Sequence, residues 1–338
     1  MQFKTLFNPF VWPYAFVIWV RNKLYDFGIF KVSEIPVASI CVGNLSLGGT
    51  GKSPLTNWLI DWKKNEMQVQ VLSRGYGRIS KGARLFQFSE NAETFGDEPF
   101  MYVLKHGINI DIAVAEKRWD GWKILPQKDN RILILDDAFQ HRAVKAKCNI
   151  VVTTFQKPFF KDNLLPFGRL RELPFALKRA DLVLVSKCPE TLQESEKQIF
   201  TSNIHRFKNI PVFFGRYRYE APISFKAEHN WNAKNVLLVT GIAQPEPIEI
   251  YLKAKFKVET IKFPDHHNFT ASEIQAIHRK FDTFADCDKA ILTTEKDFAR
   301  LWHKREEWGM KDFPWFYLPI ALEIENEIEF KNLVNSKL

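Results

Sequence analysis

The sequence predicts an α/β protein in which a largely parallel sheet domain is followed by a second, smaller α/β domain. Short apolar runs rich in β-branched residues alternate with amphipathic stretches, which is the pattern of βαβ units. The chain of 338 residues also exceeds one typical domain of about 150 residues. The runs form two groups separated by a polar, alternating stretch at 214–222: 37–42, 69–72, 110–115, 132–135, 149–152, 181–185 and 212–214, then 236–240, 258–263, 290–293 and 315–318.

We therefore expect three segments: an N-terminal helix in residues 1–30, a first domain in 31–222 and a second domain in 223–338. The stretch 272–284 has helical spacing and is expected to pack within the second domain. A cleft between two domains is a common place for a ligand.

Composition fits a folded protein with an anionic partner. Apolar residues make up 46% of the chain and charged residues 26%, as in ordinary globular proteins. The net charge of +9 favours nucleotides, phosphorylated small molecules, nucleic acid or an acidic membrane surface. The cysteines are far apart and form no CxxC pair, which argues against a zinc site or a disulfide framework and favours a reducing, cytosolic setting.

The first thirty residues are unusually apolar. From Phe10 to Val20 every residue is apolar, aromatic or proline, but this run is about half of the ~20 residues that a spanning helix needs. Arg21 and Lys23 follow the run and no cleavage-like site is present, so we expect the segment to be retained rather than removed as a signal peptide.

Helical spacing within this segment predicts an amphipathic helix. Pro13 can begin it, and its apolar side is formed by Pro13, Phe16, Val17, Trp19, Val20, Leu24 and Phe27. An aromatic apolar side with basic residues nearby is typical of a helix lying in the membrane interface. A helix packed on the core of the protein would show the same pattern, so the residues alone leave both interpretations open.

A glycine-rich loop follows the first strand of the predicted sheet. Glycines let successive backbone N–H groups turn toward one phosphate, while a lysine reaches the β- and γ-phosphates and a hydroxyl reaches magnesium. Pro54 is suited to the first turn of the next helix, whose N-terminus adds partial positive charge. We therefore predict a P-loop NTPase-like domain that binds ATP through Ser46, Leu47, Gly48, Gly49, Thr50, Gly51, Lys52 and Ser53.

One feature leaves this motif incomplete by itself. Ser46 stands at the first glycine position of GxxxxGK[ST], so a simple glycine-rich turn is the alternative. A second element supports nucleotide binding: the apolar run 132–135 ends in Asp136 and Asp137, where P-loop proteins place a carboxylate beside Mg²⁺. Adjacent residues of an extended chain point to opposite sides, so the sequence does not decide which of the two acids faces the metal.

At this point the chain resembles the tetraacyldisaccharide 4'-kinase family, the lipid A 4'-kinases of Gram-negative bacteria. The resemblance extends over nearly the whole chain. The family's loop resembles GNxxxGGxGK[ST] and lacks the first glycine, which accounts for Ser46. The matching motifs are VGNLSLGGTGKSP at 42–54, SRGYGR at 73–78, GDEP at 96–99, DDAFQHR at 136–142, GRLRE at 168–172, TGIAQP at 240–245, DHH at 265–267 and TEKD at 294–297.

The resemblance implies phosphoryl transfer from ATP to the 4'-hydroxyl of a tetraacylated glucosamine disaccharide 1-phosphate, giving lipid IVA. It also implies that the N-terminal helix lies against an anionic membrane surface, with the protein peripheral or monotopic on the cytoplasmic face of the inner membrane. Asp97 matches the family's acid–base residue and His266 the histidine that pairs with it, which would join the two domains. Lys52, which the loop places at the β- and γ-phosphates, is expected to act in catalysis. The family positions suggest Arg74 and Arg118 for substrate binding, with Arg171 a further candidate, and the TEKD run is expected to be structural.

Two other function classes were weighed against this kinase. A soluble P-loop NTPase acting as a switch or maturation factor would share Lys52, Ser53 and Asp136 but would hydrolyse nucleotide without a lipid acceptor. A GTPase usually carries an Asn-Lys-x-Asp motif, and the run SKCP at 186–189 lacks its aspartate. A nucleic-acid-binding protein is disfavoured because the basic residues are scattered and no recognition motif is present.

Overall fold

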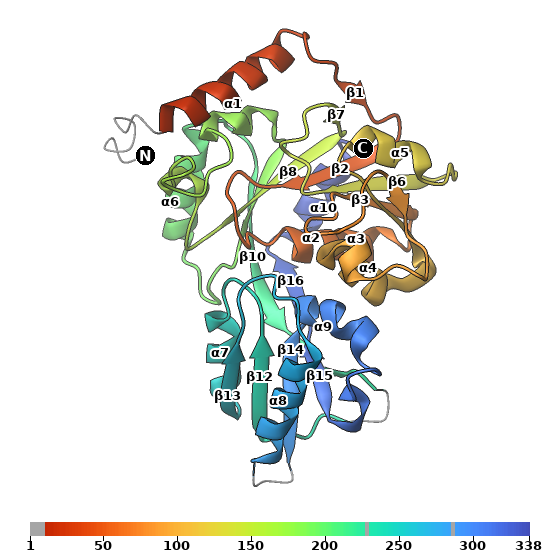
Figure 1. The fold of residues 1–338 in the computed structure, drawn as a ribbon. Coiled ribbons are helices and arrows are strands. Elements are labelled where there is room, and N and C mark those ends of the chain that lie inside the picture. Colours follow the sequence, from red (N-terminus) through yellow and green to blue (C-terminus); the bar gives the residue numbers. More distant parts are fainter. Residues whose placement is uncertain (1–10, 227–229, 285–287) are drawn as a thin grey trace.

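The chain folds around two sheets, stacked end to end, with a long helix lying across the far end of the larger one (Figure 1). This computed structural model describes residues 11–226, 230–284 and 288–338. The expected α/β class with parallel-rich sheets is confirmed.

The larger sheet has nine strands in the order β16-β10-β9-β8-β2-β6-β3-β5-β4. Adjacent strands of this sheet are parallel except at its two edges, where β4 runs antiparallel to β5 and β16 runs antiparallel to β10. All seven predicted strands of the first group are present. The strands are β2 (Ala38–Gly43), β3 (Gln68–Ser73), β4 (Arg84–Leu85), β5 (Ile110–Val114), β6 (Arg131–Asp136), β8 (Cys148–Thr154), β9 (Leu182–Ser186), β10 (Val212–Tyr219) and β16 (Ile320–Ile324).

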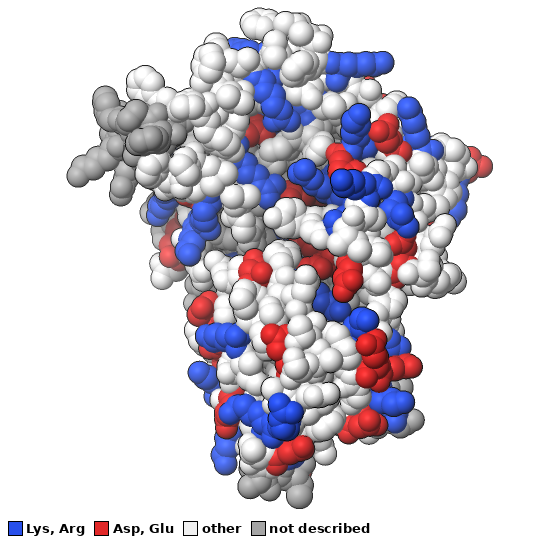
Figure 2. Space-filling view, in the orientation of Figure 1, with Lys and Arg blue, Asp and Glu red and all other residues white. Residues whose placement is uncertain are grey.

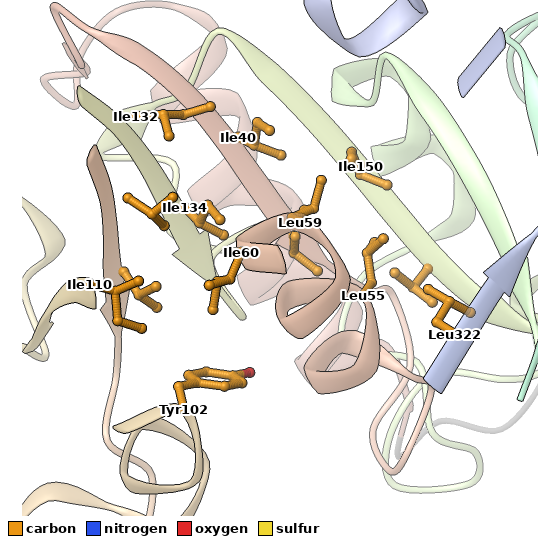
Figure 3. Close-up of a cluster of buried hydrophobic side chains, with 14 of the residues drawn as sticks. Ile40, Leu55, Leu59, Ile60, Tyr102, Ile110, Ile132, Ile134, Ile150 and Leu322 are labelled. Carbon is orange, nitrogen blue, oxygen red and sulfur yellow. The ribbon is translucent and has the colours of Figure 1, made fainter. Parts of the chain in front are cut away.

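Helices cover both faces of this sheet because alternate side chains of its buried strands point to opposite sides. On one face Ile40 and Ile134 pack with Leu55, Leu59 and Tyr102 of the helices (Figure 3). The opposite face forms a separate core. The helices of this part of the chain are α2 (Lys52–Lys63), α3 (Ala92–Phe95), α4 (Asp97–His106), α5 (Arg118–Ile124) and α6 (Glu194–His205), with 3-10 turns at Gly107–Asn109, Phe159–Lys161 and Pro174–Arg179.

The smaller sheet has five strands in the order β11-β15-β14-β12-β13. Its central strands are parallel, and all four predicted strands of the second group are found. The predicted helix at 272–284 is α8 (Ala271–Asp282), which packs on the opposite face from α7 (Glu246–Lys253). The other elements are β11 (Ile223–Ser224), β12 (Asn235–Thr240), β13 (Lys257–Lys262), β14 (Lys289–Thr294), α9 (Glu295–Leu301), β15 (Trp315–Leu318) and 3-10 turns at Trp302–Lys304 and Met310–Asp312.

The end of the chain returns to the larger sheet. β10 pairs with β9 through residues 212–214 and then with β16 through residues 215–219, so these two strands extend from one sheet toward the other. After β16, α10 (Glu327–Asn335) packs its Phe330 against Phe213 and Trp58 of the large domain. Residues 320–338 therefore belong with the larger sheet, unlike the division at residue 222 that the sequence suggested.

The N-terminal helix α1 (Val11–Asp26) is present as expected. It is joined to the body by its polar groups: Tyr14 Oη donates to Arg171 O at 3.1 Å, and Arg21 Nη2 donates to Gln140 O at 2.5 Å. Below it, β1 (Ser33–Glu34) and β7 (Val144–Lys145) form a short parallel pair. Within the described residues, no helix has the length and apolar character required to cross a membrane.

Candidate active site

The glycine-rich loop joins β2 to α2 and is tied to its surroundings at both ends. Leu47 N donates to Arg169 O at 2.7 Å and Arg171 N donates to Leu45 O at 2.7 Å, so the start of the loop pairs with the GRLRE segment. At the other end, Ser186 Oγ donates to Thr50 O at 2.7 Å. These contacts hold both ends of the loop in place.

The backbone conformation at the first position of the loop explains why a serine is tolerated there. Among the described residues other than glycine, five have positive φ, and Ser46 is not one of them. It forms an antiparallel bridge with Leu170 instead. Ser46 Oγ is buried without a hydrogen-bond partner in the described structure, so this hydroxyl is available to a ligand.

Glycine is required at the end of the loop. Gly51 has φ +96°, and a Cβ at this position would lie 2.2 Å from the Tyr217 hydroxyl and 3.0 Å from Ser186 Oγ. The left-handed backbone and the close approach therefore both exclude a side chain. Lys52 and Ser53 follow as the first residues of α2, whose N-terminus faces the loop.

Asp136 and Asp137 point to different partners, as two adjacent residues at a strand end should. Asp136 is fully buried and accepts hydrogen bonds from Thr56 Oγ1 at 3.3 Å, Ser73 Oγ at 3.4 Å and Tyr102 Oη at 3.2 Å. Burial raises its pKa to about 7, and the negative charges of Glu98 and Asp137 add to the rise.

Asp137 faces the two cations nearest to the loop. Arg171 Nη1 donates to its carboxylate oxygens at 3.0 and 3.1 Å, and Lys52 Nζ lies 3.6 Å from Oδ1. Burial alone raises the pKa of Asp137, but the charges of Lys52 and Arg171 outweigh it and hold the pKa below its ordinary value. Asp137 therefore forms ion pairs with Lys52 and Arg171, the two cations that the sequence assigns to the binding of ATP and substrate.

The oxygen donors around the loop fit Mg²⁺. This ion is held in nucleotide enzymes by one or two protein oxygens, with phosphates and water completing the octahedron. Ser53 Oγ and the Asp136 carboxylate meet this requirement. A carboxyl group with a pKa near 7 becomes a stronger ligand once a cation favours its ionised form.

Asp97 and His266 meet across the gap between the two sheets. Asp97 begins α4, and His266 lies in the loop after β13, 169 residues later in the chain. His266 Nδ1 is 2.9 Å from Asp97 Oδ2. The expected pairing of these residues between the two domains is therefore present in the structure.

The turn before Asp97 depends on a glycine contact between two motifs. Gly96 has φ +99°, and a Cβ there would lie 2.8 Å from Gly75 Cα. The SRGYGR and GDEP motifs thus touch through two glycines, which fixes where α4 begins. Asp97 follows at the first position of that helix.

Comparison with known proteins agrees with this geometry. The family description "Tetraacyldisaccharide-1-P 4'-kinase" matches residues 3–338. The chain belongs to the tetraacyldisaccharide-1-P 4'-kinase family. A tetraacyldisaccharide 4'-kinase of Flavobacterium psychrophilum is 40% identical, covering 98% of this chain and 96% of the relative, and one of Cytophaga hutchinsonii is 36% identical, covering 99% and 96%.

A solved structure has the same fold. The crystal structure of LpxK from Aquifex aeolicus in complex with ATP is 29% identical, covers 97% of each chain and superposes with a TM-score of 0.75. The family resemblance that the motifs suggested is confirmed, as is the kinase class.

Within this kinase family member, the predicted arginines lie in different environments. Arg171 contacts Asp137, as described above. Arg74 is exposed and makes no hydrogen bond or ion pair with the residues that the structure describes, and its charge contributes to lowering the pKa of His141. Arg74 is therefore a cation free to meet an anionic ligand.

Arg118 has a place that the sequence did not predict. Its side chain is buried, and its guanidinium donates to the backbone carbonyls of Ala115 at 2.6 Å, Asp136 at 3.2 Å and Asp137 at 3.4 Å. All three acceptors are main-chain carbonyl oxygens, and two of them belong to Asp136 and Asp137. The geometry thus favours support of the Asp136–Asp137 backbone over direct substrate contact.

The TEKD run of this kinase family member contains charged groups that enter the site, which sequence analysis missed. Lys296 Nζ donates to Glu98 Oε1 at 2.6 Å, and the same oxygen accepts from Ser53 Oγ at 3.0 Å. Burial would raise the pKa of Glu98, but the charges of Lys296 and Lys52 lower it to about 2. Only the spatial approach of α9 to α4 reveals this role, because Glu98 and Lys296 are 198 positions apart.

Proposed function

We propose that this protein transfers the γ-phosphoryl group of ATP to the 4'-hydroxyl of a tetraacyldisaccharide 1-phosphate, giving lipid IVA, at the cytoplasmic face of the bacterial inner membrane. The observation that carries the proposal is the Asp97–His266 contact of 2.9 Å, which is formed between the domain that holds the P-loop and the smaller domain. A kinase needs a group that orients the acceptor hydroxyl near the donor phosphate, and a simple hydrolase of this fold does not need a carboxylate–histidine pair there.

Donor binding falls to the loop. Backbone N–H groups of Gly48, Gly49 and Gly51 and the Lys52 ammonium would hold the phosphates, with Lys52 leaving Asp137 when ATP arrives. Ser53 and Asp136 would hold Mg²⁺, which neutralises charge on the β- and γ-phosphates when bound. We favour Asp136 as the metal-side carboxylate because it contacts Thr56 in the first turns of α2, whereas Asp137 faces Lys52 and Arg171.

Acceptor activation falls to Asp97 and His266. The 4'-hydroxyl oxygen forms the new P–O bond as the bond to ADP breaks, and its proton passes to the Asp97–His266 pair. Burial raises the pKa of Asp97, but the hydrogen bond from His266 and the charge of Arg300 outweigh it and lower the pKa. The carboxylate is therefore ionised at neutral pH and mainly orients the hydroxyl until the bond forms.

Anion recognition on the acceptor side is assigned to Arg74 and Arg171. A guanidinium matches phosphate oxygens with two parallel hydrogen bonds, which suits a sugar that already carries a 1-phosphate. Arg74 has no partner to give up among the described residues, whereas Arg171 must share or leave Asp137.

Membrane contact is assigned to the outward side of α1. Trp12, Phe16, Trp19 and Phe27 are 51% to 74% exposed, while Tyr14 and Arg21 turn toward the protein. A helix packed on its own core would have the opposite arrangement. The surface over α1 is largely uncharged and Lys and Arg side chains lie close beside it, as expected for an anionic lipid surface (Figure 2).

The decisive experiment is acceptor-dependent ATP consumption. Purified protein with Mg-ATP and the tetraacyl disaccharide 1-phosphate in mixed micelles should form the 4'-phosphorylated product, detected by mass. We expect Asp97→Ala to lower kcat by about 10² or more, the usual contribution of a positioned acid–base group, and to leave ATP binding intact.

Glu93→Ala is the matched control, since Glu93 is an exposed carboxylate on the neighbouring helix α3. It should leave turnover unchanged. Transfer that survives Asp97→Ala unimpaired would exclude the proposed role of Asp97. ATP hydrolysis at the same rate with and without the acceptor would favour the soluble NTPase instead.

A further inference from the structure

Helix α9 begins within the TEKD motif, at Glu295, and lies against α4, the helix that begins with Asp97. Three pairs of charged side chains join them: Glu295 with Lys105 at 3.3 Å, Lys296 with Glu98 at 2.6 Å, and Arg300 with Asp97 at 2.8 Å. The proposed function uses Asp97 but leaves Arg300 without a role. Its contact is made with the one carboxylate on which acceptor activation depends.

Arg300 is itself fixed by groups of the smaller domain. Nη1 donates to Asp297 Oδ1 at 2.7 Å and to Gly241 O at 2.9 Å. Asp297 is fully buried and also accepts from Gly241 N at 3.0 Å and from Thr294 Oγ1 at 2.8 Å. The side chain of Arg300 is only 5% exposed, so it is held as part of the fold and is not a surface cation.

The contact is specific to one oxygen of Asp97. Arg300 Nε donates at 2.8 Å to the same Oδ2 that His266 Nδ1 approaches at 2.9 Å, and Arg300 Nη2 lies 2.8 Å from that oxygen. The side-chain hydrogen bonds recorded for Asp97 among the described residues all go to Oδ2. Two fixed groups on one oxygen set the plane of the carboxylate and leave the other oxygen for a ligand.

We propose that Arg300 is a positioning residue for phosphoryl transfer, which holds Asp97 Oδ2 and aims Oδ1 at the acceptor hydroxyl. The proposal rests on the proposed function of the Asp97–His266 pair. Arg300 Nη2 lies 3.1 Å from His266 Nδ1, too close for both atoms to carry hydrogens aimed at each other. Arg300 therefore contacts both members of the Asp97–His266 pair, Asp97 through Nε and His266 through Nη2.

The charged and titratable groups around Asp97 come from four elements. Arg300 and Lys296 come from α9, His266 and Asp265 from the loop after β13, Glu98 from α4 itself, and Tyr76 from the loop after β3, its ring 5.7 Å from that of His266. Arg300 is the one that stays protonated at every accessible pH and donates directly to the carboxylate. Removing it therefore makes Asp97 easier to protonate.

A purely structural role for Arg300, joining the two domains, predicts a different result. If Arg300 only joins the domains, then breaking another α4–α9 ion pair should cause a similar loss. The Lys105–Glu295 pair provides this comparison because Lys105 lies near the far end of α4 from Asp97. Lys105→Met removes an ion pair from the same interface and leaves the Asp97 contacts untouched.

The experiment compares Arg300→Met, Arg300→Lys and Lys105→Met with the wild type, measuring kcat and KM over pH in the acceptor-dependent assay. For Arg300→Met we expect kcat to fall by about 10-fold or more, KM for ATP to stay within about 2-fold, and the acidic fall in activity to move to higher pH. Arg300→Lys keeps the charge but cannot span Asp97 and Asp297, so kcat should fall while the acidic limb stays near that of the wild type. Lys105→Met should change neither quantity.

Three results would overturn the proposal: an Arg300→Met acidic limb that superimposes on the wild type, a loss confined to KM, or an Arg300→Lys enzyme with wild-type kcat. If Arg300→Met does not fold, Arg300→Lys alone decides. A wild type that shows no acceptor-dependent turnover contradicts the proposed function instead. In that case the His266 ring signal in NMR, followed over pH, decides: its response to Asp97 protonation must move to higher pH in Arg300→Met.

Discussion

At the scale of single residues, the site contains a carboxyl group whose burial disfavours its ionised form. Asp136 has only hydroxyl donors around it, from Thr56, Ser73 and Tyr102, and no cation contacts it directly. The folded protein keeps a proton on this group up to about pH 7, whereas an ordinary aspartate releases it near 3.8. The residue is thus prepared for a cation at a cost to the stability of the ligand-free fold.

This conflict predicts a pH-dependent gain of stability for Asp136→Asn in protein freed of metal and nucleotide. A raised folded-state pKa contributes stability that is complete below the unfolded pKa and is lost as the pH rises through about 7. Asparagine avoids that loss, and the three hydroxyls can reorient to accept from its amide. At pH 8 the free energy of unfolding in urea should exceed that of the wild type by about 2 kcal/mol, with little difference near pH 4.

Asp120→Asn is the control, because Asp120 is an exposed carboxylate on α5. It should shift stability equally at both pH values. A stability gain for Asp136→Asn that is the same at pH 4 and pH 8, or a loss at pH 8, would contradict the assignment of a buried, proton-holding carboxyl group.

At the scale of elements, the strands were predictable and their partners were not. Runs such as 69–72 and 132–135 are apolar because both faces of a central parallel strand are buried, and this pattern is local. β16 was missed because its identity as a strand depends on β10, more than 100 residues earlier, where Gly215 pairs with Ile324. Non-local pairing leaves no trace in the spacing of one short segment.

The residues of the site likewise divide into those that the sequence predicts and those that it does not. Residues in a contiguous motif, such as Lys52 and Ser53, were found because the loop, its lysine and its hydroxyl are consecutive. Arg118 was assigned to substrate from its family position alone, and burial gives it main-chain acceptors instead. Arg300 was missed because it lies three positions beyond the end of the TEKD run and its partner Asp97 is 203 positions away.

The return of α10 to the large domain predicts a strong effect of Phe330→Ala. Phe330 is fully buried, with its ring 5.1 Å from that of Phe213 and 5.4 Å from that of Trp58. Loss of a buried phenylalanine leaves a cavity between α10 and the sheet. The free energy of unfolding should fall by about 3–5 kcal/mol in urea.

Ile328→Ala is the matched control on the same helix, because Ile328 is 78% exposed. It should cost well under 1 kcal/mol. Equal effects of the two substitutions would mean that α10 is not part of the core of the large domain.

At the scale of the whole molecule, contacts link the helix proposed for lipid contact with the proposed donor and acceptor sites. α1 is linked to the GRLRE segment by Tyr14, and that segment pairs with the P-loop through Leu47 and Arg171. The smaller domain reaches the same site through His266 and Arg300. In the proposed membrane-bound state, a lipid head group beside α1 would lie next to the large domain, on which α1 packs (Figure 1).

This arrangement predicts that vesicle binding depends on the outward aromatic side of α1 together with the charge of +9. Phe16 and Trp19, whose rings stack at 6.2 Å, should enter the interface of anionic vesicles, so Phe16→Ser with Trp19→Ser should weaken binding in a sedimentation assay by about 10-fold or more. High salt should weaken vesicle binding of the wild type and of this double variant alike, because salt screens the charges and leaves the apolar contact unchanged.

The control is Phe88→Ser with Ile108→Ser, which removes two residues that are 81% and 82% exposed elsewhere in the same domain. This double variant should bind vesicles as the wild type does. Equal losses in the two double variants would show that general surface hydrophobicity, and not α1, carries the contact.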